Sequence, residues 1–162
     1  MPFAPQRWHV QVACLVGAAL SFSAWQAEAQ NTLDVASTKA TLLRLNASAS
    51  TQDVTQWVLY SADHQGLPFV VIDKRDARVF VFSPAGRFLG VSPALLGLAI
   101  GDEGVAGLGE RPLSQISPEE RTTPAGRYLA ALDRNLSGQT ILWVDYSQSI
   151  SMHPVRSVNP AE

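Results

Sequence analysis

Ser151, His153 and Asp145 supply the side-chain types of a hydrolytic triad within a short stretch of sequence. A serine nucleophile needs a sharp turn that exposes its hydroxyl beside an oxyanion hole, which a G-x-S-x-G motif provides. The sequence has no such motif, and Ser151 and His153 lie two residues apart on one face of an expected strand. The pattern therefore argues against a serine hydrolase. Taken alone, a histidine on an apolar strand is more often a packing residue than a catalyst.

The sequence also has few cysteine and histidine side chains for thiol chemistry or metal binding. The only cysteine is Cys14, near the N-terminus, and the histidines beyond it, His64 and His153, are far apart in the sequence. They therefore do not have the spacing of a metal-ligand pair. The glycine-rich stretch from Leu95 to Leu108 is not followed by the Lys-Ser/Thr of a phosphate loop. We predict no metal and no cofactor.

The N-terminus has the three parts of a secretory signal. Arg7 and His9 precede an apolar stretch from Val10 to Trp25, and Ala27-Glu28-Ala29 offers the small-x-small pattern of a cleavage site. The apolar stretch is shorter than the ~20 residues of a spanning helix. We predict that residues 1–29 are a signal peptide cleaved after Ala29, which leaves no stable membrane span. The protein is then exported to the periplasm or cell envelope.

Composition narrows the partners of the exported chain. The net charge is −2, and no basic stripe or Lys/Arg cluster points to nucleic acid or to an anionic membrane surface. Removal of Cys14 with the signal peptide leaves no thiol and no disulfide. The remaining residues are enough for one domain with a real core.

The first elements after the signal peptide are expected to be helical. Residues 30–50 are rich in Ala, Ser, Thr and Asn and are predicted to be a linker with at most one helical turn. A helix follows, capped by Ser50 or Thr51, and His64-Gln65-Gly66 is expected to end it. Its predicted packing face carries Val54, Trp57, Val58 and Ser61 at helical spacing. Residues 30–66 are therefore assigned as a linker and short helix.

From Leu67 the apolar pattern changes to that of strands. Three runs predict an antiparallel meander: Phe69–Ile72, Arg78–Phe82 and Arg87–Val91. Because both faces of Arg78–Phe82 are apolar, this sheet is expected to be part of a sandwich or barrel. A long surface loop follows, and then three more strands: Arg127–Leu132, Ile141–Tyr146 and Ser149–Val155. We predict a mainly β fold with a short N-terminal helical region.

Three segments in order carry a family resemblance: Thr123-Pro124-Ala125-Gly126-Arg127-Tyr128, Ile141-Leu142-Trp143-Val144 and Ile150-Ser151-Met152-His153. Together they resemble the catalytic domain of the L,D-transpeptidases (the YkuD-like family), over roughly Pro68 to His153. Thr123, Pro124 and Gly126 match the family's Thr-Pro-x-Gly turn, Tyr128 its following aromatic, and His153 its histidine. The resemblance implies that residues 67–162 are a partial β-sandwich or barrel domain of this family.

The resemblance also implies a reaction. In this family a cysteine thiolate attacks a carbonyl in the tetrapeptide stem of peptidoglycan, a histidine acts as the general base, and no cofactor takes part. His153 matches that base, although the Pro154 that follows it replaces the more usual glycine. The family's cysteine lies beyond the histidine, and this sequence ends at Glu162 without one. We therefore expect an exported acyltransferase that is inactive in the form given.

A secreted, non-catalytic module that binds peptidoglycan stem peptides is the alternative. In that protein Tyr128, Trp143 and Tyr146 would line a groove for the stem, although these aromatic residues fit a packed core equally well. A finished module is expected to have a finished sheet. If the cysteine-bearing strand is missing, Ile150–Val155 has an unpaired edge, which favours a truncated transpeptidase over the binding module.

Overall fold

The computed structural model describes residue 32 and residues 34–135 and 137–155. The predicted signal peptide lies outside these residues. The chain forms two compact units, of which the first ends at Ser92 and the second begins at Pro93. Each unit is described separately below. Among the described residues, no helix is both long and apolar enough to cross a membrane.

The first unit contains a helix over residues 34–44, in the segment that we predicted to be a linker. Thr38 and Leu42 lie one helical turn apart, and both are almost fully buried. The linker prediction is therefore wrong for these residues. The apolar pattern did not predict this helix, because one of the residues on its buried face is a threonine. The hydroxyl of Thr38 is satisfied there, since it donates to the Gly86 carbonyl (2.9 Å).

A second helix, α2, runs from Ala49 to Ser61. Its N-cap is Ser48, whose hydroxyl accepts the backbone N–H of Thr51 (3.2 Å), and the helix ends at Ala62 in a left-handed conformation. Both ends therefore precede the predicted ones.

The predicted packing face of α2 is also wrong. The buried residues are Thr51, Thr55 and Leu59, whereas Trp57 is 55% exposed and Val54 is 47% exposed. The hydroxyl of Thr55 donates to the carbonyl of Thr51 (2.7 Å), so burial leaves it satisfied.

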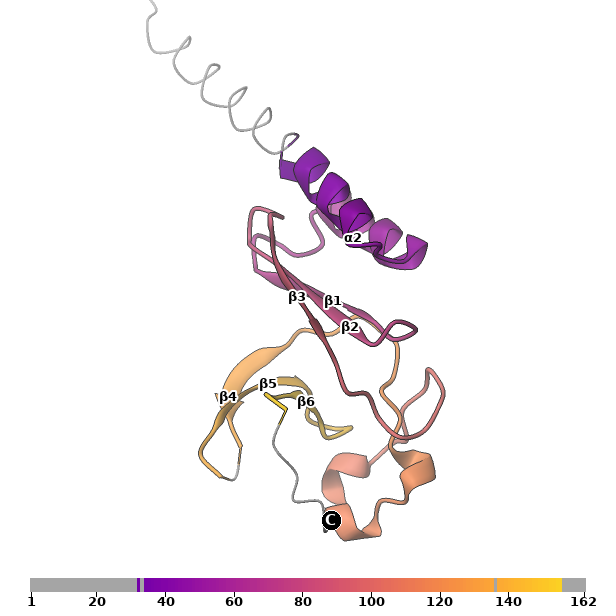
Figure 1. Cartoon of the computed structure of the whole chain (residues 1–162). Helices are drawn as coiled ribbons and strands as arrows, with labels where there is room; N and C mark the ends of the chain where they lie inside the picture. The colour runs from indigo at the N-terminus through magenta and orange to yellow at the C-terminus, as the bar shows by residue number, and fades with distance from the viewer. Residues whose placement is uncertain (1–31, 33, 136, 156–162) are drawn as a thin grey trace, which may run out of the picture. The chain divides into compact units, whose positions relative to one another are not determined.

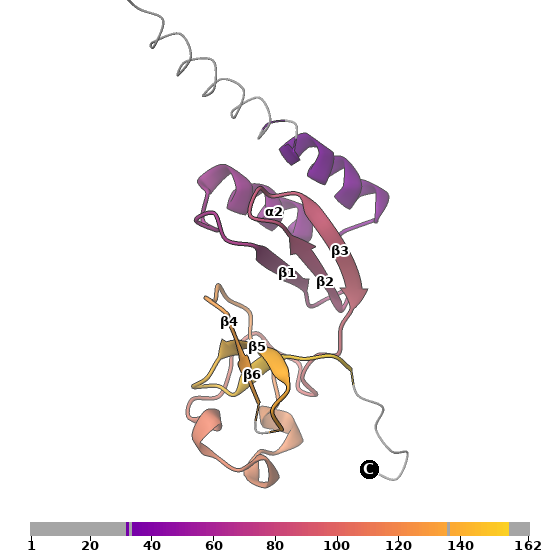
Figure 2. The ribbon, with the colours of Figure 1, turned by 90° about the vertical axis from the view of Figure 1, so that its left-hand side faces the viewer.

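The first sheet is the predicted antiparallel meander, in the order β1 (Phe69–Asp73), β2 (Arg78–Phe82) and β3 (Phe88–Pro93). Both helices lie on the same side of this sheet (Figures 1 and 2). The core between the helices and the sheet contains buried apolar side chains, with two further phenylalanines packed against it: Leu42, Ala47, Val71, Phe80 and Phe82, with Phe69 and Phe88. Alternation along β1 and β2 sends these side chains to one face.

A buried carboxylate joins α2 to β1. Asp73 is only 7% exposed and accepts hydrogen bonds from the hydroxyls of Ser48 (2.5 Å) and Thr51 (2.8 Å). It also accepts the backbone N–H groups of Arg75 (3.0 Å) and Asp76 (3.1 Å). Burial by itself raises the pKa of Asp73, but these four hydrogen bonds outweigh it and hold the pKa below its usual value. The buried side of α2 therefore includes the polar residue Thr51, because Asp73 is its hydrogen-bond partner.

The second unit contains the second sheet, in the order β4 (Ala131–Arg134), β5 (Thr140–Asp145) and β6 (Ile150–Met152). The strands predicted over Ile141–Tyr146 and Ser149–Val155 are present with shifted ends. The strand predicted over Arg127–Leu132 begins only at Ala131 and continues to Arg134. The described chain is a mixed α/β structure with two three-stranded antiparallel sheets, and it contains no closed barrel. The prediction of a mainly β fold is corrected because the two helices form a full layer over the first sheet.

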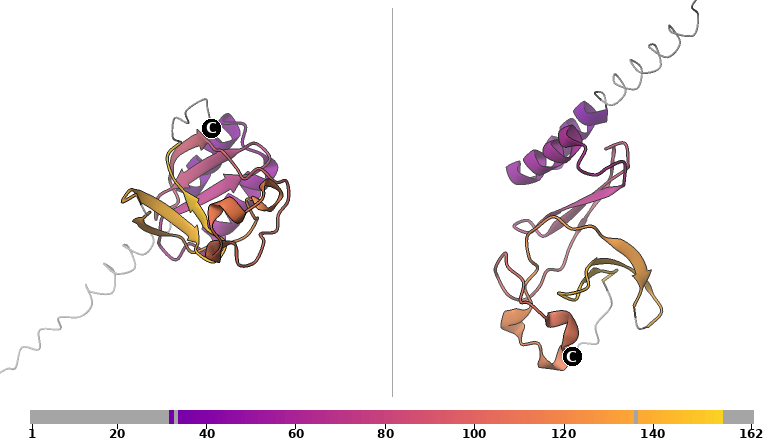
Figure 3. Two further views of the ribbon diagram at one scale, coloured as in Figure 1. Left: turned by 90° about the horizontal axis from the view of Figure 1, so that it is seen from below. Right: turned by 180° about the vertical axis from the view of Figure 1, so that it is seen from behind.

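Along the chain between β3 and β4, the predicted surface loop contains three short 3-10 helices, which lie together in the salmon and orange part of the trace (Figure 3). They span Leu108–Glu110, Leu113–Gln115 and Pro118–Glu120. Ser117 and Glu120 form a reciprocal capping box around the third. The guanidinium of Arg111 pairs with both carboxylate oxygens of Glu120 (2.7 and 2.9 Å). The loop therefore has its own internal structure.

Candidate active site

His153 is the first residue after β6, and its side chain is exposed. The register of β5 and β6 pairs Leu142 with Met152 and Trp143 with Ser151. Because Pro154 follows, the backbone of His153 is restricted to extended conformations. The fold thus places the candidate base at the end of an edge strand, one residue beyond the last pair of the sheet.

One ring nitrogen of His153 has a fixed role. Nδ1 lies 2.9 Å from the carbonyl oxygen of Pro154. A carbonyl oxygen only accepts, so this hydrogen bond requires the proton to be on Nδ1. In the neutral ring Nε2 is then left as a proton acceptor, and none of the described residues donates to it. This is the tautomer that a general base acting through Nε2 requires.

Trp143 and Tyr146 form a stacked pair, with ring centroids 4.5 Å apart and an interplanar angle of 21°. Simple alternation places residues three apart on opposite faces of a strand. Here the register is irregular between Trp143 and Asp145, and a bulge of this kind changes the face on which later residues lie. The hydroxyl of Tyr146 donates to Asp133 on β4 (3.0 Å). The two aromatic residues predicted from the sequence are therefore brought together.

Tyr128 also belongs to the second unit. It is half-buried, and its ring packs on Gly126, where an added Cβ would lie 3.0 Å from the Tyr128 hydroxyl oxygen. No ring contact or hydrogen bond within the described chain joins it to Trp143 or Tyr146. Among the described residues, direct contact therefore joins Trp143 to Tyr146 but not Tyr128 to either of them.

The segment Thr123-Pro124-Ala125-Gly126 was predicted to be a turn, and the structure shows a bend at Gly126 alone. It is fastened to the glycine-rich stretch: the hydroxyl of Thr123 accepts the N–H of Gly97 (2.7 Å), and the carbonyl of Asp102 accepts the N–H of Ala125 (2.8 Å). These contacts explain the difference, because the segment's polar groups bind a neighbouring segment. Pro124 is buried at this junction.

Gly97 has a specific steric reason to be glycine. A Cβ at this position would overlap the carbonyl oxygen of Arg121, and the neighbouring Ala99 forms a parallel bridge with Thr122. The two segments approach as closely as their backbones allow. The sequence showed the glycines but not the segment that they approach.

The turn between β5 and β6 is held by Asp145, whose carboxylate accepts from the backbone N–H and hydroxyl of Ser147 and from both the backbone and the side chain of Gln148. The Ser147 carbonyl accepts the N–H of Gly109 (3.0 Å), which ties this turn to the 3-10 segment. The turn that sets β6 beside β5 is therefore well supported. Sequence reasoning assigned no such role to Asp145.

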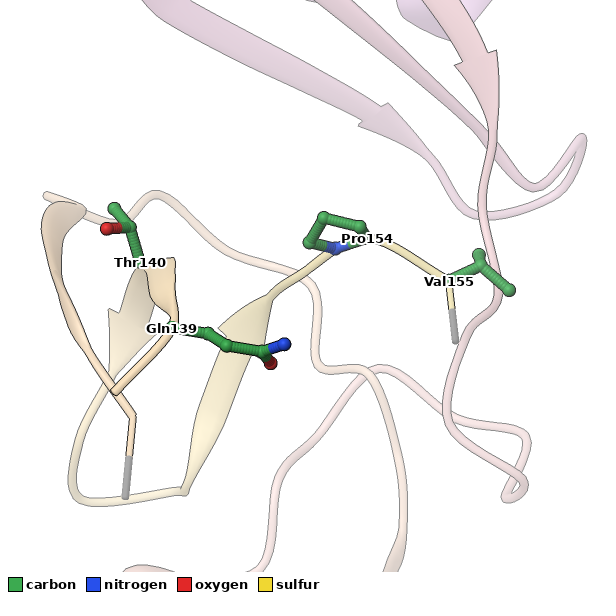
Figure 4. Close-up of a pocket in the computed structure, with 4 residues that line it drawn as sticks. All are labelled: Gln139, Thr140, Pro154 and Val155. Carbon is green, nitrogen blue, oxygen red and sulfur yellow. The ribbon is translucent and has the colours of Figure 1, made fainter. Parts of the chain in front are cut away.

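The second unit has an open hollow of about 290 Å³ (Figure 4). Its lining comes from the β4–β5 hairpin and from the segment after β6: Gln139, Thr140, Pro154 and Val155. His153 does not line it, so the hollow is not positioned for chemistry by that imidazole. Its volume is also at the lower limit of small-molecule sites.

Within the described parts of the chain, no group of three or more His, Cys, Asp or Glu side chains is placed to hold a metal ion. Comparison of the chain with protein-family models, with curated proteins and with solved structures finds no match.

Proposed function

We propose that this chain is part of an exported L,D-transpeptidase that transfers acyl groups between peptidoglycan stem peptides, with His153 as the general base. The observation that carries the proposal is the position and tautomer of His153: it follows an edge strand, Nδ1–H is held by the Pro154 carbonyl, and Nε2 is left as an acceptor. The ordered motifs from Thr123 to His153 support the same family.

The chemistry requires a thiolate, which His153 would generate. A free thiol has a pKa of ~8.5 and is mostly protonated at neutral pH, so a nearby imidazole must take its proton. Nε2 would accept that proton as the thiolate attacks the stem carbonyl, and would return it to the departing amine. No cysteine occurs from Leu15 to Glu162, so we predict no turnover by this sequence in its mature form.

The first experiment reads the source DNA beyond codon 162. An in-frame Ser/Thr-x-Gly-Cys element would supply the nucleophile. The extended protein would then release D-alanine from a tetrapeptide stem, and His153→Ala would lower the rate by roughly a hundredfold or more. His64→Gln is the matched control, since it removes the other histidine of the exported chain. An extended protein that keeps its rate after His153→Ala would refute the proposed base.

A non-catalytic stem-binding module is the second candidate, and the stacked Trp143 and Tyr146 favour it. Tyr146 is 57% exposed although it is a large aromatic side chain. A stop codon in the source DNA, together with binding of the chain to isolated peptidoglycan, would select this function. Release of D-alanine by the chain of 162 residues would exclude it.

A further inference from the structure

His64 connects the segment after α2 to the turn between β2 and β3. Its Nε2 lies 3.1 Å from the carbonyl oxygen of Pro84, and its ring packs on Phe69, with the ring centroids 5.4 Å apart. A carbonyl oxygen only accepts, so the neutral ring carries its proton on Nε2. Nδ1 is buried and has no hydrogen-bond partner among the described residues. The imidazole is therefore held in one tautomer, with a buried and unprotonated second nitrogen.

A second proton on this ring has no acceptor in the closed arrangement. It would bind to Nδ1 and create a buried, charged N–H group, which is costly when nothing accepts its hydrogen bond. The ring of Phe69 attracts a charged imidazole, but a cation–π contact is generally weaker than that penalty. The contact with Pro84 therefore favours the neutral ring, whereas solvent accommodates both charge states.

The charged side chains of the adjoining segments do not relieve this penalty. Asp63 precedes His64 in the chain, and Arg87 ends the turn between β2 and β3. Asp53 and Asp73 lie toward the far ends of α2 and β1 from His64. None of these four groups forms a hydrogen bond with Nδ1. Protonation of the ring is therefore coupled to its release.

The turn that His64 contacts is also held by both helices of the first unit. The hydroxyl of Thr38, on the helix over residues 34–44, donates to the Gly86 carbonyl (2.9 Å). The side chain of Leu59, on α2, packs so closely on Gly86 that an added Cβ would overlap it. Of the three side chains that hold this turn, only His64 is titratable. Its charge state therefore decides whether the third contact forms.

We propose that His64 is an acid-sensitive latch within the first unit. At neutral pH the uncharged ring fastens the segment after α2 to the Pro84 carbonyl. Below about pH 6 an imidazole takes up a proton, and the ring moves to solvent, where both of its N–H groups donate to water. Pro84 is exposed and His64 is half-buried, so this release leaves the core of the first unit in place. The inference goes beyond the proposed function, because it needs neither His153 nor a nucleophile.

Amide hydrogen exchange, followed by NMR on the full chain, measures the opening. The amides of Leu67 and Gly86 report on it, because they donate to the carbonyls of His64 (2.8 Å) and Ser83 (2.9 Å) in the two joined segments. An imidazole in water has a pKa of ~6.5, so a latch that excludes the proton when closed should open about thirtyfold more at about pH 5 than at about pH 7.5. The ratio of the exchange rates of the wild-type chain and His64→Gln, taken at each pH, removes the ordinary pH dependence of exchange.

His64→Gln keeps an N–H donor for the Pro84 carbonyl but does not titrate, so this variant should not show the rise. His153→Gln, which removes the other histidine of the described residues, should keep it. The amides of Gly109 and Ala125 in the second unit should exchange alike in all three proteins. Nitrogen NMR of the wild-type ring needs no variant and should find the neutral proton on Nε2. A proton on Nδ1, equal exchange in the wild-type chain and His64→Gln at acid pH, or loss of the rise in His153→Gln would overturn the proposal.

Discussion

Replacing Ser48 by alanine removes one hydroxyl group that makes two hydrogen bonds. Its hydroxyl caps α2 by accepting the Thr51 N–H, and it donates to the buried carboxylate of Asp73 (2.5 Å). An N-cap is worth about 1 kcal/mol, and a hydrogen bond to a charged group about 1.5–3 kcal/mol. Asp73 keeps its other donors, so no further desolvation penalty is expected. The free energy of unfolding should fall by about 2.5–4 kcal/mol.

Urea unfolding followed by circular dichroism at the helical wavelength measures this loss, because both described α-helices lie in the first unit. Ser50→Ala is the matched control, since Ser50 is an exposed serine in the same helix, and it should cost less than about 0.5 kcal/mol. Similar free energies of unfolding for the two variants would refute the account of Asp73 as the link between α2 and β1.

The same contact predicts a pH dependence. The folded pKa of Asp73 lies below 3.8, the usual value for an aspartate, so its ionisation stabilises the fold above that pH, and the contribution is lost as the pH falls toward the folded pKa. Ser48→Ala removes one of the hydrogen bonds that lower this pKa. The variant should therefore lose less stability than the wild-type chain between neutral pH and acid. An identical acid dependence in both would contradict this explanation.

Three further predictions concern packing and charge. Glu120→Gln should reduce stability at neutral pH. The ion pair with Arg111 and the capping box lower the pKa of Glu120 from 4.5 to about 2, so the difference from the wild-type chain should vanish as the pH falls through this range. Urea unfolding curves of both proteins across this range measure it. Gly97→Ala should destabilise the second unit by about 1–3 kcal/mol, because its Cβ would overlap a backbone carbonyl, whereas Gly90→Ala meets nothing within 4 Å; near-UV circular dichroism distinguishes them. Leu59→Ala should cost about 2–5 kcal/mol and Trp57→Ala under about 1 kcal/mol by thermal unfolding, and the reverse order would restore the packing face predicted from the sequence.

The strands were predictable from the sequence because their side chains are β-branched or aromatic and are bounded by clear turn residues. The helix over residues 34–44 was not, since the burial of Thr38 depends on a carbonyl in the turn after β2. The prediction of the packing face of α2 was wrong for a related reason. Thr51 faces inward because its hydroxyl donates to Asp73. The spacing of apolar residues along the helix does not indicate such a partner.

The candidate site shows the same division. The position of His153 at a strand end follows from the local sequence, and so does the presence of aromatic residues on β5 and directly after it. The stack of Trp143 on Tyr146 does not, because it depends on an irregular register that alternation cannot reveal. The contact between Gly97 and Thr123 joins two distant segments. The course of the backbone, which the sequence alone does not show, explains why position 97 is a glycine and position 123 a threonine.

On our proposal, His153 presents Nε2 as the general base for a thiol nucleophile in a site that binds a peptidoglycan stem. Nitrogen NMR of the imidazole in the full chain, with and without a tetrapeptide stem, tests it most directly. The account predicts the Nδ1–H tautomer in the neutral ring, because the Pro154 carbonyl accepts that proton, and a shift of the Nε2 signal when the stem binds. A ring that carries its proton on Nε2, or one whose signals ignore the stem, would contradict it.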